Sequence, residues 1–200
     1  MYISPTYRRV AHHEAGHAAA YLSAAFEIDG IAVGRRGLRR MFGDGSHEST
    51  QWMGYCGNPR ETLADLQRPL HWRLSITGAL AGHAAEAHYD ELRAKRFCFH
   101  PPGGDWNYYI ENLCSRRDDW GQAVYRAEAF LNLFEKWRAE HTREERIGRV
   151  IHLVEAGMTD AYALVVRHWS VIEALATSLM EREFLSGEEA ARVFHSPTRV

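Results

Sequence analysis

The stretch His13-Glu14-Ala15-Gly16-His17 constrains the fold most. Its two histidines and its glutamate can act together at one site only if the stretch forms a helix. Residues four apart in an α-helix lie one turn above each other on one face, so both histidines can direct a ring nitrogen at one point. Neutral imidazole is a good ligand for Zn²⁺. Glu14, beside the first histidine, can reach a metal-bound water as a general base. The stretch therefore predicts a helix that carries a metal site on one face.

The residues around this stretch support a helix over residues 5–26. Ser4-Pro5 provides an N-cap followed by a first-turn proline. Gly16 costs a helix about 1 kcal/mol relative to alanine, which indicates that a neighbouring element packs too closely there for a side chain. The apolar residues recur at helical spacing, as Val10, Ala11, Ala18, Tyr21, Leu22 and Ala25.

Downstream, most segments have helical periodicity, and one early segment does not. Residues 28–33 read as a strand, and the glycine-rich loop 34–59 contains a second candidate strand near 50–56. The sequence predicts a mainly α fold, with a small early β element and a C-terminal helical bundle. We expect a single domain over 1–200, with a metal-site half, 1–118, and a C-terminal helical half, 119–200. The expected helices are 70–92, 105–114, 120–140, 143–156, 159–183 and a short last helix opened by the capping box at Ser186.

Composition narrows the classes of function. The formal net charge is −2, with both signs interspersed, so neither nucleic acid nor an anionic membrane is an expected partner. The three cysteines, Cys56, Cys98 and Cys114, are far apart and do not indicate a disulfide framework. No signal-peptide pattern and no apolar run of membrane-spanning length occurs, which makes a cytoplasmic location the expectation. No Gly-x-x-x-x-Gly-Lys-Ser/Thr motif is present.

The order of motifs resembles the zinc peptidase domain of FtsH-type AAA proteases. Residues 9–18 are similar to that family's V-A-x-H-E-A-G-H-A segment, and Met53-Gly54-Tyr55 to its L-G-Y segment. Residues 77–86 resemble its L-x-G-G-R-A-A-E helix, although Ala81 and His83 replace the first glycine and the arginine. Residues 103–106 fall where the family has S-N-D-L, and residues 161–194 resemble its closing helices.

The resemblance implies a zinc site whose third ligand is Asp105, after His13 and His17. A carboxylate after a glycine-rich turn can reach a metal ion from the start of a helix, although an acid there can also act simply as an N-cap. Glu86 is the competing third ligand. We interpret it as the acceptor of the second ring N–H of a ligand histidine; a helix carboxylate paired with an arginine is the alternative.

Other candidate residues have more modest interpretations. Gly54 and Tyr55 fall on the strand that the resemblance assigns to substrate binding, although a plain strand aromatic would look the same. His12, His83 and His88 are interpreted as packing or surface histidines rather than ligands.

The sequence thus predicts a zinc metalloendopeptidase that cleaves unfolded or loosely structured polypeptides, with Glu14 as the general base. Two alternatives stay open: a non-catalytic zinc-containing binding or adaptor module, and a zinc hydrolase of a non-peptide amide. Without a P-loop of its own, the chain would depend on a separate ATPase partner to unfold stable substrates. The apolar C-terminal helices predict a homo-oligomer, with a dimer favoured. The residues behind that expectation are Trp137, Leu153, Val154, Leu164, Val165, Trp169, Ile172 and Leu175.

Overall fold

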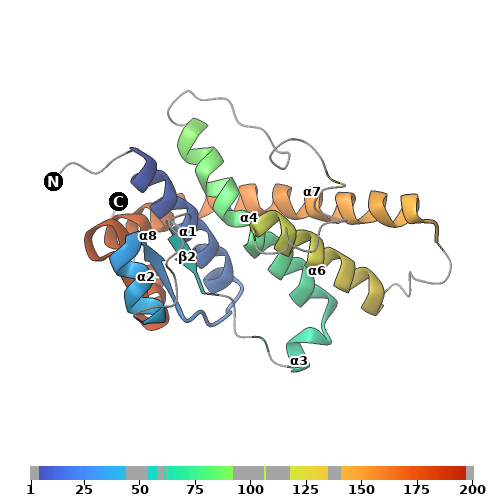
Figure 1. Cartoon of the computed structure of the whole chain (residues 1–200), viewed down its shortest axis with the longest axis horizontal. Coiled ribbons are helices and arrows are strands. Elements are labelled where there is room, and N and C mark those ends of the chain that lie inside the picture. The colour runs from blue at the N-terminus through green and yellow to red at the C-terminus, as the bar shows by residue number, and fades with distance from the viewer. Residues whose placement is uncertain are drawn as a thin grey trace.

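The computed structural model describes residues 5–43, 54–57, 61, 63–91, 106, 118–134 and 141–196. Helices make up most of it, and a small three-stranded sheet lies to one side (Figure 1), which confirms the predicted mainly α class with a small β element. In chain order the elements are α1 (Pro5–Ser23), β1 (Gly30–Val33), α2 (Gly34–Phe42), β2 (Gly54–Cys56), α3 (Leu63–Leu66), α4 (Pro69–Glu91), α6 (Asp119–Phe134), α7 (Arg143–Arg167), α8 (Trp169–Arg182), β3 (Phe184–Ser186) and α9 (Gly187–His195).

Helix α1 lies at the centre of the molecule and packs most extensively against α4. Its contact faces consist of small side chains, which let the two backbones approach closely. A Cβ atom on Gly16 would lie 2.5 Å from the carbonyl oxygen of Ala81 and 2.6 Å from the Cβ of Ala85. The close neighbour inferred from the helical glycine is therefore α4. The fully buried alanines at this centre are Ala11, Ala15, Ala18, Ala19, Ala81, Ala84 and Ala85.

The sheet has three antiparallel strands in the order β2-β1-β3, with β1 buried along its whole length. Ala32 is opposite Tyr55 of β2 and Phe184 of β3. The two early strands were expected from the sequence, whereas β3 was not. β3 follows α8 directly and pairs with β1. The small sheet therefore connects an early segment of the chain with a segment near its C-terminus.

Two boundaries differ from the sequence-based expectation. Residues 34–42 form helix α2 rather than loop, and α2 rests on the end of α8, where Arg36 Nε lies 2.9 Å from Glu183 Oε2. The last two long helices part at His168 rather than near residue 157. Trp169, the first residue of α8, packs its ring against His12 and His88, at centroid distances of 5.5 and 4.6 Å.

The C-terminal helices conceal much of the apolar surface from which oligomerisation was expected. Val154, Val165, Ile172 and Leu175 are each fully buried within the chain. Helix α7 runs alongside α4 and α6 (Figure 1), which accounts for part of that burial. The dimer stays a prediction: Leu153, Leu164 and Trp169 are only partly buried, and Trp137 lies outside the described residues. None of the described helices combines the length and apolarity that a membrane crossing requires.

A polar cluster ties the segment after β2 to the helices. The Oε1 atom of Glu61 lies 2.9 Å from His71 Nε2, 3.2 Å from Ser75 Oγ and 2.7 Å from an Arg126 guanidinium nitrogen. Burial opposes ionisation of Glu61, but Arg126 and His71 outweigh it and lower the pKa of this carboxyl. One carboxylate thus connects the chain beyond β2 with both α4 and α6.

We expect Gly16→Ala to lower the free energy of unfolding by about 1–3 kcal/mol, because the new methyl group overpacks the α1–α4 contact. Alanine's higher helix propensity, about 1 kcal/mol, offsets only part of this cost. Gly148→Ala is the matched control, since a Cβ at that helical position meets no atom within 4 Å. It should stabilise the protein. Urea denaturation measures both, and a stabilised Gly16→Ala variant would contradict the close packing.

We expect Glu61→Gln to lower the free energy of unfolding at pH 7 by about 1–3 kcal/mol, through loss of charge-assisted hydrogen bonds. The folded-state pKa of Glu61 lies below its unfolded value, so its contribution is complete above the unfolded pKa, about 4.3, and disappears as the pH falls through the folded pKa. The gap between wild type and variant should therefore narrow below about pH 4. Thermal melts across pH test this, with the exposed Glu173→Gln as control. A gap that is constant with pH would rule out the charge as its cause.

Candidate metal centre

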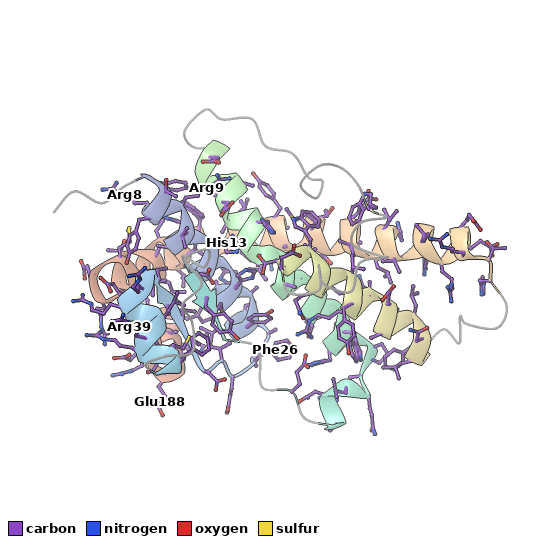
Figure 2. The ribbon with its side chains drawn as sticks, in the orientation of Figure 1. Arg8, Arg9, His13, Phe26, Arg39 and Glu188 are labelled. Carbon is purple, nitrogen blue, oxygen red and sulfur yellow. The ribbon has the colours of Figure 1, made fainter. Side chains whose placement is uncertain are left out.

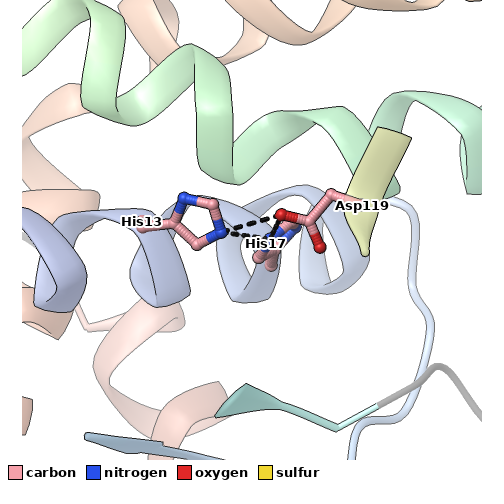
Figure 3. A group of neighbouring side chains, drawn as sticks. All are labelled: His13, His17 and Asp119. Atoms are coloured by element: carbon pink, nitrogen blue, oxygen red, sulfur yellow. Dashed lines mark hydrogen bonds and ion pairs between the residues drawn. The ribbon is translucent and has the colours of Figure 1, made fainter. Parts of the chain in front are cut away.

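His13 and His17 lie one turn apart on α1 and direct their Nε2 atoms at the same point. The two Nε2 atoms are 3.0 Å apart (Figure 3), and the side chains are only 14% and 6% exposed. Helix α1 is surrounded by other elements along this stretch, so the pair sits inside the molecule rather than on its surface.

Helix α4 supplies acceptors for the other ring nitrogens. Nδ1 of His17 lies 2.8 Å from the carbonyl oxygen of Gly78. Nδ1 of His13 lies 3.2 Å from Glu86 Oε1, at ion-pair distance but without the angles of a good hydrogen bond. Arg9, one turn before His13 on α1 (Figure 2), lies 3.1 Å from the other oxygen of Glu86. An acceptor at Nδ1 keeps the proton there, so Nε2 of each histidine is left with a lone pair.

A third ligand candidate comes from the first residue of α6. Asp119 Oδ2 lies 2.9 Å from His13 Nε2 and 3.4 Å from His17 Nε2. The preceding Asp118 caps the helix by accepting the backbone N–H of Gly121 at 2.7 Å. Asp119 is therefore free to turn toward the histidines, and the positive end of the helix dipole favours its charge.

The three atoms form an arrangement that requires positive charge. Two imidazole lone pairs and a carboxylate oxygen within 3.4 Å of one another repel unless protons or a cation lie among them. Burial works against the charged forms, but the carboxylates raise the pKa of His13 and His17, and the histidines hold the pKa of Asp119 well below its usual range. In the absence of a metal, the cluster would thus bind protons.

The spacing also suits a metal ion. Ligand atoms on a tetrahedral ion with bonds of about 2.0–2.1 Å lie about 3.3 Å apart, close to the separations found here. A Cβ atom on Gly82 would lie 2.6 Å from His13 Nε2, so the lack of a side chain there keeps this side of the cluster clear. Among the described residues, His13, His17 and Asp119 form one group that could hold a metal, and His13, His83 and Glu86 form another.

Glu14 lies on the side of α1 that faces β2 and is 6% exposed. A Cβ atom on Gly54 would collide with Oε1 of Glu14 and lie 2.7 Å from Val10 Cγ1, so the strand backbone runs directly against this carboxyl. Burial raises the pKa of Glu14 to about 7, while His13 and His17 partly offset that effect. The carboxyl can therefore both accept and release a proton near neutral pH.

The structure places most, but not all, of the predicted site residues. Asp105 lies outside the described residues, so its role as a ligand stays a prediction. Glu86 lies where a partner of His13 was expected, and it also pairs with Arg9. Gly54 and Tyr55 lie on β2, with the Tyr55 ring edge-on to Phe42 at 4.8 Å.

Sequence reasoning missed two residues of this centre. Asp119 fell at a predicted helix boundary, and the Asp118-Asp119 pair before an apolar helix was the signal that could have drawn attention to it. His83 was interpreted as a packing or surface residue, yet its Nε2 lies 3.4 Å from Asp119 Oδ2. Burial and the neighbouring His13 lower the pKa of His83 to about 4. His12, by contrast, packs against the rings of Tyr89 and Trp169.

Comparison with known proteins adds one relative. No family model matches this chain. The chain is similar to the ATP-dependent zinc metalloprotease FtsH of Thermus thermophilus, with 27% identity over 213 residues. The match covers 96% of this chain and 30% of that protein, so the chain spans about a third of its relative's length. The comparison supports a relationship to FtsH.

We expect His13→Ala, His17→Ala and Asp119→Ala each to remove bound metal after loading with Zn²⁺ and dialysis, because each deletes one of three ligands. Glu86→Ala should weaken metal affinity by about 10–100-fold without abolishing it, as losses of a ligand's hydrogen-bonding partner do. Atomic emission and chelator competition measure both effects.

Asp105→Ala is the decisive comparison for the third ligand. If it retains full metal while Asp119→Ala loses it, Asp119 is the ligand. The reverse result would restore the sequence-based assignment.

Proposed function

We propose that this chain is a zinc-dependent metalloendopeptidase. The observation that carries the proposal is the joint placement of three candidate ligands, His13, His17 and Asp119, with a buried carboxyl, Glu14, against a strand at the edge of the sheet. A purely structural metal site has no use for such a carboxyl. The relationship to a zinc metalloprotease supports the same interpretation.

The ligand set fits zinc. Two imidazoles and one carboxylate form a common catalytic zinc set, which leaves a fourth position for water or substrate. Bound zinc would supply a Lewis acid that makes water a nucleophile at neutral pH and polarises a carbonyl.

Glu14 would handle the protons of the reaction. Its carboxylate takes a proton from the attacking water as the water oxygen bonds to the peptide carbon. The same carboxyl then returns a proton to the leaving nitrogen when the C–N bond breaks. A buried base suits this role, because few waters compete for its proton.

The substrate would bind as an added strand. β2 pairs with β1 on one side and is one of the two outer strands of the described sheet, the other being β3. An extended polypeptide that pairs with β2 through main-chain hydrogen bonds would lie beside Glu14, since Gly54 contacts that side chain. Main-chain pairing tolerates many sequences but requires an extended segment. Unfolded or loosely structured polypeptides are therefore the proposed substrates, and stable proteins would need an unfolding ATPase as partner.

We expect Glu14→Gln to reduce cleavage of an unfolded protein such as casein by at least about 10²-fold, because the amide cannot accept the water's proton. The zinc content and the melting temperature should change little, since the two side chains are nearly isosteric. Glu155→Gln, at an exposed position on α7, is the matched control and should keep full activity. A chelator should stop the wild type, and added ATP should have no effect.

Two outcomes would redirect this proposal. A zinc-loaded wild type that cleaves no unfolded polypeptide, but binds such chains, would favour the binding module. Hydrolysis of simple acyl amides without cleavage of polypeptides would favour the non-peptide amidase.

A further inference from the structure

His83 is the most exposed imidazole of the metal centre. Its side chain is 25% exposed, against 14% for His13 and 6% for His17. Its Nε2 lies 3.4 Å from Asp119 Oδ2, and its ring meets that of His13 edge-on at 5.1 Å. The ring is also stacked on Trp120 at 5.5 Å. His83 thus stands at the outer side of the centre with its orientation fixed by packing.

Two candidate ligand groups share His13: one consists of His13, His17 and Asp119, and the other of His13, His83 and Glu86. The first contains both histidines of α1, and we take it as the metal site. His83 then lies beside the ligands, with its Nε2 3.4 Å from Asp119 Oδ2. A metal held by His13, His17 and Asp119 would keep a fourth position, and His83 would border the centre from the side of α4.

His83 and Glu14 approach the centre from different sides. Figure 3 shows α4 on one side of the α1 segment that carries His13 and His17, and β2 on the other. His83 is a residue of α4, while Glu14 contacts β2 through Gly54. A peptide carbonyl bound at the centre would then have a base on one side and an imidazole on the other.

The contact with Asp119 also determines which ring nitrogen of His83 carries the proton. A carboxylate accepts hydrogen bonds and has no proton to donate, so its proximity to Nε2 favours the tautomer with N–H at that atom. Nε2 of His83 is therefore a hydrogen-bond donor at the outer side of the centre, beside Asp119 Oδ2.

We propose that His83 is a further catalytic residue: its Nε2–H donates a hydrogen bond to the oxygen of the scissile carbonyl as that oxygen gains negative charge. The inference rests on the proposed peptidase function and adds to it the group that stabilises the developing charge. A donor fixed in place before the reaction acts more strongly on the transition state than on the bound substrate, because the charge appears only there.

The test compares His83→Ala, His83→Gln and the control His152→Ala, an exposed histidine on α7. We expect His83→Ala to keep stoichiometric zinc and, after cobalt substitution, an unchanged visible spectrum. Its kcat should fall about 10²-fold or more with little change in KM, the size of effect seen when one such donor is lost. Calorimetry should show a similar loss of affinity for a peptide phosphonate, whose tetrahedral anionic phosphorus replaces the carbonyl. Glutamine, which can place an N–H near the same point, should recover part of both losses.

Each remaining result overturns a specific claim. A changed cobalt spectrum or lost zinc in His83→Ala would make His83 a ligand and exclude the donor role. Unchanged kcat and unchanged phosphonate affinity would exclude it as well, as would a wild type that binds no phosphonate. If the wild type binds the phosphonate but cleaves nothing, the peptidase proposal fails. In that case the phosphonate affinities of the variants still decide whether His83 donates to an anionic oxygen.

Discussion

The close contact between α1 and α4 is the constraint on which the metal centre depends. It brings the Gly78 carbonyl within hydrogen-bond distance of His17 and Glu86 within ion-pair distance of His13, the two candidate ligand histidines. The closeness requires small residues on both helices, as the position of Gly16 against Ala81 and Ala85 shows. A wider separation would leave both imidazoles without a fixed orientation, and their Nε2 atoms would no longer converge. The small residues between α1 and α4 thus pack the core and, at the same time, hold the two histidines in position.

The charged groups of the site, in contrast, oppose burial in this core. Two histidines, Asp119 and Glu14 gather in a largely apolar interior, where burial penalises each charge. The cost is acceptable only because the groups compensate one another and because Asp119 stands at a helix N-terminus. The proposed metal ion would add the positive charge that this cluster of lone pairs and carboxylates requires.

Features of the site that depend on one local element could be predicted from the sequence, whereas those that depend on contacts between distant segments could not. His13, Glu14 and His17 could be recognised because a single helix sets their relation. Asp119 could not, because its approach depends on where α6 starts and on how α6 packs more than a hundred residues after His13. The same holds for β3, whose pairing with β1 has no local signal. Helix α2 was not predicted, because its nine residues include two glycines and four arginines without a clear helical pattern. It forms in contact with the end of α8, through Arg36 and Glu183.

The sheet shows how these long-range contacts serve the site. β3 occupies one edge of β1, so β2 is left as the outermost strand on the other edge, and this is the strand that lies against Glu14. β3 is an outer strand as well, so a polypeptide added to its outer side would lie on the far side of β1 from the carboxyl. β2 is the outer strand whose backbone lies against Glu14, through Gly54. The proposed substrate strand would therefore meet the candidate metal centre at β2. The C-terminal residues contribute by pairing β3 with β1, which places β1 in the middle of the sheet and β2 at the edge beside α1.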